Sequence, residues 1–159
     1  MAFARYVLDK VPAFDVELGP GAYGILEELL FSLQLVAAGY RIKAAFDVCA
    51  EHDFDETRLF RASLIDGHIN QGRSRAYIDY HWRHRPGRPF PRLRLFMHMP
   101  RLAWYRLMHP AQMRSLEGVS EIEAGLITKV LYYRQYLKET KRPHNYEQHG
   151  LVKVAGLLA

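Results

Sequence analysis

The sequence predicts an α/β chain with a short, partial remnant of a β-sheet and a mostly helical C-terminal half. Three observations support this prediction. Apolar residues follow a helical spacing over residues 26–38, a run of β-branched, aromatic and small apolar residues follows over 40–50, and helix-like segments fill most of the chain beyond residue 56. We divide the chain into an N-terminal part, residues 1–57, and an arginine-rich helical part, residues 58–159.

The N-terminal part is expected to begin with a short helix over residues 4–11, which stops at Pro12 because proline cannot continue a helix. The run Gly19-Pro20-Gly21 then predicts a loop. These two elements lead into the strongest helical pattern of the chain.

The helix over 26–38 has apolar residues every three or four positions, so that they share one face. Gly39 is a helix-ending signal, because glycine readily adopts the left-handed backbone of a C-terminal cap. The next run, over 40–50, has the length and composition of a strand entering a sheet, and it ends at Glu51. Helix, glycine turn and strand are therefore expected in this order.

The middle of the chain predicts two helices, over residues 56–71 and 74–84. We place their junction near Gly72, since glycine weakens the interior of a helix. A proline-rich stretch over 86–91 then makes a stiff break.

Two further helices are predicted after this break. One covers residues 92–108 and contains Pro100, which is expected to kink it. The other covers residues 119–140. It opens with Ser120 and has Glu123 three positions later, the spacing of a capping box.

The charge of the chain is unevenly distributed. Acidic residues dominate residues 1–57, whereas residues 58–115 hold twelve arginines, no lysine and two acidic residues. Arginine favours flat anionic groups such as phosphates, because its guanidinium donates paired hydrogen bonds. As anion or membrane contacts we single out Arg83, Arg85, Arg88, Arg92 and Arg94.

The segment 92–108 interleaves arginine with leucine, methionine and aromatic residues, a composition typical of helices that lie in a membrane interface. The alternative is a core helix whose arginine stems extend outward to water. RNA is the least favoured partner, because no nucleic-acid-binding motif accompanies the arginines.

Several classes of protein are excluded or disfavoured by composition. The single cysteine, Cys49, rules out a disulfide framework and a cysteine-based zinc site, and it favours a reducing compartment. No uninterrupted apolar window is long enough for a membrane-spanning helix, and the N-terminus lacks the features of an export signal. We therefore expect a cytoplasmic protein, at most associated with the inner surface of a membrane.

Two acidic residues mark the start of the predicted helix over 26–38. Glu27 and Glu28 fall in its first turn, where backbone N–H groups and the helix dipole favour carboxylates. This structural role is sufficient to account for them. The functional alternative is that one carboxylate faces a cleft and accepts a proton from an incoming nucleophile.

Metal-binding residue types follow the predicted strand. His52, Asp53 and Asp55 together offer the ligands that suit Mg²⁺ or Mn²⁺. The alternative is that Asp55 caps the next helix and that His52 is a surface residue. His81 and His84 have a spacing that permits metal binding, but the arginines around them favour anion binding or the packing of aromatic rings instead.

Residues 1–60 contain several linked motifs in a fixed order. They are Met1-Ala2-Phe3-Ala4-Arg5, Phe14-Asp15, Leu18-Gly19-Pro20-Gly21, Glu27-Glu28, Ala38-Gly39-Tyr40-Arg41-Ile42 and His52. In these segments the chain resembles the family 2 glycosyltransferases, which have the GT-A fold. The first of these segments looks like the family's internal Gly-x-Asn-x-Ala-x-Arg stretch entered partway, and Phe14 to Gly19 look like its Phe-Asp-x-x-Leu-Gly loop. Glu27-Glu28 falls where the family has Glu-Asp, and Leu35 with the segment 38–42 is similar to its Leu-x-x-x-Gly-Tyr-x-Ile continuation.

The resemblance implies transfer of a sugar, with inversion, from a nucleotide-sugar donor to an acceptor hydroxyl. It assigns Glu28 as the general base, Glu27 as its support, and His52 as a ligand of the Mn²⁺ or Mg²⁺ ion that neutralises the leaving diphosphate. The chain departs from the pattern by having Glu instead of Asp at the base position, which shifts the carboxylate by a methylene.

In that family the nucleotide-binding half precedes the stretch matched here. The resemblance therefore makes residues 1–57 the acceptor-side part of a GT-A-like domain, and the chain a fragment that is inactive alone. The alternative is a non-catalytic arginine-rich and aromatic helical module that binds a membrane surface or a partner protein.

Overall fold

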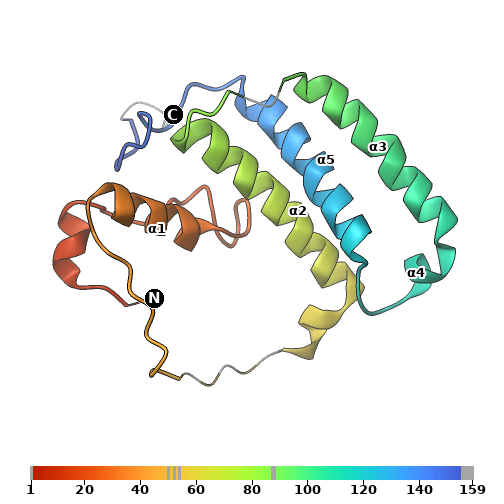
Figure 1. Ribbon diagram of the computed structural model, residues 1–159, viewed down its shortest axis with the longest axis horizontal. Coiled ribbons are helices and arrows are strands. Elements are labelled where there is room, and N and C mark those ends of the chain that lie inside the picture. The colour runs from red at the N-terminus through yellow and green to blue at the C-terminus, as the bar shows by residue number, and fades with distance from the viewer. Residues whose placement is uncertain (1, 50, 52, 54, 87–88, 155–159) are drawn as a thin grey trace.

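The computed structural model describes residues 2–49, 51, 53, 55–86 and 89–154. Within them the chain is built from α-helices and short 3₁₀ or π-helical segments (Figure 1). Their order is η1 (Arg5–Asp9), α1 (Glu27–Ala37), η2 (Glu56–Leu59), α2 (Arg61–Tyr77), η3 (Ile78–Trp82), α3 (Pro91–Met108), α4 (Pro110–Arg114) and α5 (Glu121–Glu139).

The prediction of an α/β fold with a GT-A-like sheet remnant is wrong. Helices make up 57% of the structure and strands 3%, and the described residues form no sheet. The expected strand over 40–50 is instead an irregular segment, exposed from residue 41 to residue 49; residue 50 lies outside the described residues. A strand needs a neighbouring strand for its N–H and C=O groups. No β-bridge joins residues 41–49 to another described segment.

Most of the predicted helices are confirmed. α1, α3 and α5 each end within a residue or two of the positions expected from the sequence. Gly39 follows α1 with φ of +88°, the left-handed backbone expected of a helix-ending glycine. Residues 5–9 form a 3₁₀ helix within the predicted 4–11.

α1 is held by apolar contacts on two sides. Leu30 belongs to a buried cluster with Leu18 and Tyr77, whereas Phe31 and Leu35 pack in a second cluster that includes Val7 and Val11 of the N-terminal segment. Apolar side chains are therefore buried on two sides of α1, in agreement with the wide buried face that the spacing predicts.

Three long helices form the other side of the molecule. α5 lies between α2 and α3, and its contact with α2 is the most extensive in the protein (Figure 1). α2 and α5 run in the same direction, and α3 runs opposite to both (Figure 1). This arrangement places α3 at the outer edge, with α5 covering only one of its faces.

Gly72 does not separate two helices, as the sequence predicted, because α2 continues through it to Tyr77. A Cβ at this position would lie 2.6 Å from the carbonyl oxygen of Thr128 and 3.0 Å from the backbone nitrogen of Tyr132, both on α5. Glycine is needed here for the close approach of two helices, and not for a break in one.

We predict that Gly72→Ala lowers the free energy of unfolding by about 1–3 kcal/mol, because the added methyl group forces α2 away from α5. Gly67→Ala is the matched control in the same helix, where a Cβ meets nothing within 4 Å. It should raise stability by about 0.5–1 kcal/mol through helix propensity. Urea unfolding of both variants checks this, and equal stability of the two would contradict the close-approach explanation.

Candidate functional site

Glu27 and Glu28 occupy the first turn of α1, as predicted. Glu28 is exposed, whereas Glu27 is half-buried, with its carboxyl carbon 3.3 Å from where a Cβ of Gly19 would stand. The residue before the helix, Leu26, has φ of +74°, a left-handed conformation that is costly for a branched side chain. This left-handed backbone at Leu26 turns the chain sharply just before the first residue of α1. The role of Glu28 as a general base stays a prediction.

The structure assigns a capping role to one member of the expected metal site. The Oδ1 atom of Asp55 accepts a hydrogen bond from the backbone N–H of Thr57 at 2.9 Å, so Asp55 caps η2, as the structural alternative predicted. Asp53 is exposed, and His52 lies outside the described residues. In the described part of the chain no group of three or more His, Cys, Asp or Glu side chains is arranged to hold a metal ion. The ligand role of His52 and the Mn²⁺ or Mg²⁺ ion stay predictions.

His81 belongs to a buried polar network and not to an open metal site. Its Nδ1 atom accepts a hydrogen bond from the backbone N–H of Asn145 at 3.0 Å, which leaves its proton on Nε2. Nε2 then donates to Glu139 at 3.0 Å. His84 stacks on the ring of His144 with centroids 3.9 Å apart.

The buried polar network links four parts of the chain that are distant in sequence. It connects the loop before α1, the end of α2 with η3, the end of α5 and the C-terminal segment. Its members are Asp15, Glu17, Tyr23, Tyr77, His81, Gln135, Glu139, Arg142, Asn145, Tyr146 and Lys153. The sequence analysis did not anticipate this network.

Glu139 is the most connected acid on α5. Its carboxylate accepts hydrogen bonds from Tyr23, at 2.6 Å, from His81 and from Gln135, and it pairs with Arg142 at 3.1 Å. Burial raises the pKa of this carboxyl, but the hydrogen bonds outweigh burial and hold the pKa at about 2.

We predict that the protein loses stability in acid because of this carboxylate. The folded pKa of Glu139 lies below its ordinary value of 4.5, so its contribution is complete above about pH 4.5 and disappears as the pH falls towards about 2. The urea midpoint measured across this range should fall steadily, and it should fall less in Glu139→Gln, which has no proton to gain. A midpoint independent of pH across the range would contradict the assignment.

The arginines singled out from the sequence differ in their surroundings. Arg83 donates to Asp79 at 2.9 Å, and Arg85 lies 3.9 Å from the same carboxylate. Arg94 donates to the backbone carbonyl of Pro89 at 3.2 Å. Arg92 is exposed near the start of α3. Arg88 lies outside the described residues.

α3 packs on α5 through one half-buried face and buries none of its residues completely. That face consists of Pro91, Arg94, Leu95, His98, Leu102 and Tyr105. Large apolar side chains on the rest of α3 and at its N-terminal edge are exposed to water: Phe90, Leu93, Phe96, Met97, Met99, Trp104, Leu107 and Met108. Phe96 is 75% exposed and Trp104 63% exposed.

The charged side chains of α3 itself have one sign. No aspartate or glutamate occurs between Asp79 and Glu117 in the sequence, a stretch that includes all of α3. The exposed surface of α3, which we call the α3 face, therefore combines large apolar side chains with arginines. One face of this helix packs against α5 and the other is exposed, and contact of the exposed face with a membrane stays a prediction.

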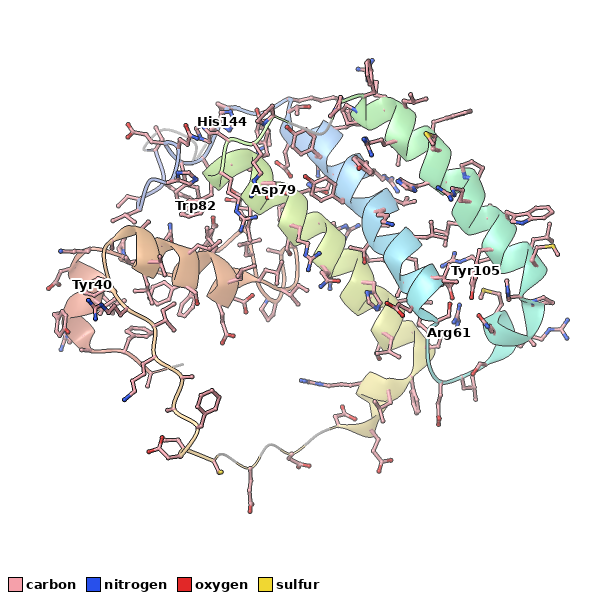
Figure 2. All side chains as sticks on the ribbon, viewed as in Figure 1. Tyr40, Arg61, Asp79, Trp82, Tyr105 and His144 are labelled. Carbon is pink, nitrogen blue, oxygen red and sulfur yellow. The ribbon has the colours of Figure 1, made fainter. Side chains whose placement is uncertain are left out.

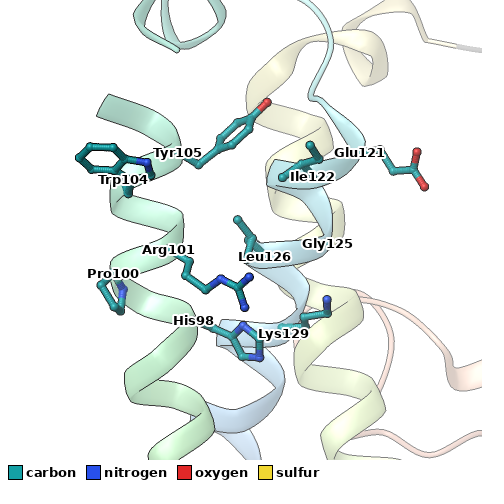
Figure 3. A pocket seen from close by; sticks show the side chains of 10 residues that line it. All are labelled: His98, Pro100, Arg101, Trp104, Tyr105, Glu121, Ile122, Gly125, Leu126 and Lys129. Carbon is teal, nitrogen blue, oxygen red and sulfur yellow. The ribbon is translucent and has the colours of Figure 1, made fainter. Parts of the chain in front are cut away.

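A groove of about 820 Å³ runs between α3 and α5 beside the α3 face (Figure 3). Trp104 and Pro100 line it from α3, and Ile122, Gly125 and Leu126 line it from α5. In Figure 3 the indole of Trp104 extends from α3 on the side of the view away from α5, whereas Tyr105 and Arg101 extend towards α5. The lining is mainly apolar, which extends the apolar surface of the α3 face towards α5.

No protein-family model, curated protein or solved structure matches this chain. None of the described helices combines the length and the hydropathy needed to cross a bilayer. The function of the chain is therefore inferred from the placement of its own side chains.

Proposed function

We propose that the chain works at an anionic membrane surface, where the α3 face lies in the interface, and that it supplies the acceptor side of a sugar transfer there. One observation carries the membrane part of the proposal: large apolar side chains and arginines share the exposed surface of α3, in a stretch without acidic residues. The two parts of the proposal are tested separately.

The physics of a membrane interface favours such a helix. Phe96 and Trp104 leave water when their rings enter the boundary between headgroups and acyl chains, and burying a large apolar side chain contributes roughly 1.5–3 kcal/mol when it is complete. Arg92 and Arg101 are exposed on the same helix, and each basic residue near anionic lipid contributes about 1 kcal/mol. Their long stems allow the guanidinium groups to stay at the phosphates while the helix sinks.

The test is co-sedimentation of the chain with phosphatidylcholine vesicles that contain phosphatidylserine. We expect Phe96→Ser/Trp104→Ser to weaken the partition at least about tenfold, since two large rings no longer leave water. The matched control, Val16→Ser/Phe46→Ser, removes two side chains that are 79% and 95% exposed outside α3, and it should bind like the parent.

Removing phosphatidylserine should also weaken binding, and added salt should do the same, because exposed charges are screened. Equal losses in the two double variants would show non-specific adsorption of apolar side chains and would contradict the role of α3. Full binding by Phe96→Ser/Trp104→Ser would contradict it as well.

The sugar-transfer part is supported by where the resembling motifs lie. The rings of Phe3 and Phe14 pack on Phe31 of α1, with centroids 5.1 and 4.6 Å apart, and Tyr40 packs on the same cluster. Motif segments separated in the sequence thus gather around α1, while Glu28 is exposed at its start. In the proposed step the Glu28 carboxylate takes the proton of an acceptor hydroxyl as that oxygen attacks the anomeric carbon, and the nucleoside diphosphate leaves.

The test follows nucleoside diphosphate release by the full-length native protein with a panel of nucleotide-sugars. Glu28→Gln should lower the turnover about 100-fold or more, the contribution typical of a general base. Glu28→Asp should keep part of the activity, and the exposed Glu56→Gln is the control for a lost charge. Turnover unchanged in Glu28→Gln would reject the base assignment.

A further inference from the structure

A second cavity, of about 440 Å³, lies where α2, α3 and α5 meet. Four cations line it: Arg75, Arg85, Arg94 and Lys129. Tyr132 and Tyr133 supply aromatic walls from α5. Its volume is within the range of small-molecule sites, roughly 300–1,000 Å³. We call this cavity the basic pocket.

One acidic residue, Asp79, lines the basic pocket, and its carboxylate already accepts hydrogen bonds from other side chains. Asp79, labelled near the end of α2 in Figure 2, accepts hydrogen bonds from Arg83 at 2.9 Å and from the Tyr132 hydroxyl at 3.0 Å. Arg85 is 3.9 Å from the same carboxylate. No other carboxylate lines the pocket among the described residues. The lining therefore has a net positive charge that a ligand of opposite charge can neutralise.

His98 adds a second, independent feature. It lines both the basic pocket and the groove beside Trp104, and its ring is stacked on Tyr133, with centroids 5.8 Å apart. The Nδ1 atom of His98 is buried and has no hydrogen-bond partner among the described residues. A buried polar atom without a partner carries a free-energy cost, so a hydrogen bond to this ring would be favourable. Burial lowers the pKa of this imidazole, as do the neighbouring cations.

We infer that the basic pocket binds a phosphoryl group. Phosphate carries multiple charges and oxygens that accept paired hydrogen bonds from guanidinium forks, which suits a pocket with several arginines and one lysine. The phosphoryl group comes either from a lipid headgroup or from a soluble phosphate compound. This inference goes beyond the proposed membrane docking, and it is tested in solution, without vesicles.

Isothermal titration of the full chain tests the inference with two probes: inorganic pyrophosphate, and dihexanoyl phosphatidic acid below its micelle concentration. Arg75→Gln and Lys129→Gln should each raise the Kd about tenfold, because each removes a cation from the lining. Arg114→Gln and Arg134→Gln remove exposed charges outside the pocket, and their Kd should stay within about twofold of the parent value.

The two probes distinguish the sources of the phosphoryl group. Binding of the lipid alone assigns the pocket to a headgroup, and binding of pyrophosphate alone assigns it to a soluble compound. Binding of both, weakened by the same pocket variants, supports the shared chemistry. Absence of saturable binding by either probe, or equal effects of the pocket variants and the outer variants, would overturn the inference.

Discussion

Replacing Asp15 with alanine is expected to lower the free energy of unfolding by about 3–5 kcal/mol. The carboxylate of Asp15 is buried and accepts hydrogen bonds from the hydroxyls of Tyr77 and Tyr146 at 2.6 and 2.7 Å. It also pairs with Lys153 at 2.6 Å. Alanine leaves two buried hydroxyls without an acceptor, and each unsatisfied donor costs about 1–3 kcal/mol.

Urea unfolding at neutral pH measures this effect. Asp66→Ala is the matched control, because Asp66 is exposed on α2, and it should change stability by less than about 0.5 kcal/mol. Asp15→Asn should fall between the two, since its amide keeps one acceptor oxygen but loses the charge facing Lys153. A parent-like midpoint for Asp15→Ala would show that the network contributes nothing to folding.

Glu123→Ala is expected to cost a similar amount, about 3–5 kcal/mol, because it leaves a buried charge without its partner. Both carboxylate oxygens of Glu123 accept from Nη2 of Arg61, at 2.7 and 2.6 Å, and Arg106 donates to it at 3.0 Å. The Glu123 side chain is fully buried, and that of Arg61 is 10% exposed. This pair joins the start of α2 to the start of α5, where Figure 2 labels Arg61.

Glu121→Ala provides the control, since Glu121 is exposed in the same first turn of α5 and should cost only a few tenths of a kcal/mol. Arg61→Leu/Glu123→Leu should be more stable than Glu123→Ala, because removal of both charges leaves neither one buried alone. Thermal unfolding of the three variants tests this order. A cost for Glu123→Ala no larger than that for Glu121→Ala would contradict the buried pair.

The helices could be predicted from the sequence because their signals are local. The spacing of apolar residues found α1, α3 and α5, and Ser120 caps α5 through a hydrogen bond from the N–H of Glu123 at 3.2 Å. The other half of the expected capping box does not form, since the Glu123 side chain pairs with Arg61 instead. The sequence contained a signal for the burial of Glu123, because the spacing i, i+4, i+7 places Glu123 on the same helical face as the apolar Ile127 and Val130.

The errors arose where structure depends on distant parts of the chain. The residues over 40–49 have strand-like composition, but composition cannot show whether a pairing segment exists. Gly72 looked like a helix break because its neighbours on α5 are about sixty positions away. The same holds for the buried polar network, since His81 and Glu139 are 58 positions apart and no local pattern links them.

The candidate site was predicted in part. The composition of residues 92–108 indicated a membrane-interface helix, but it did not show which side chains face α5 and which face water. The basic pocket combines cations from α2, α3 and α5, so no local motif reveals it. Of its lining residues, Arg85 and Arg94 were singled out from the sequence as anion contacts, whereas Arg75 and Lys129 were not.

Whether α3 enters a membrane is tested most directly by the fluorescence of Trp104 with vesicles containing brominated lipid. Of the two tryptophans, Trp82 is buried and Trp104 is 63% exposed on α3. We predict strong quenching in the parent when the vesicles contain phosphatidylserine, and loss of that quenching in Trp104→Phe. Tryptophan emission that stays unquenched while the chain is bound to the vesicles would contradict insertion of the α3 face.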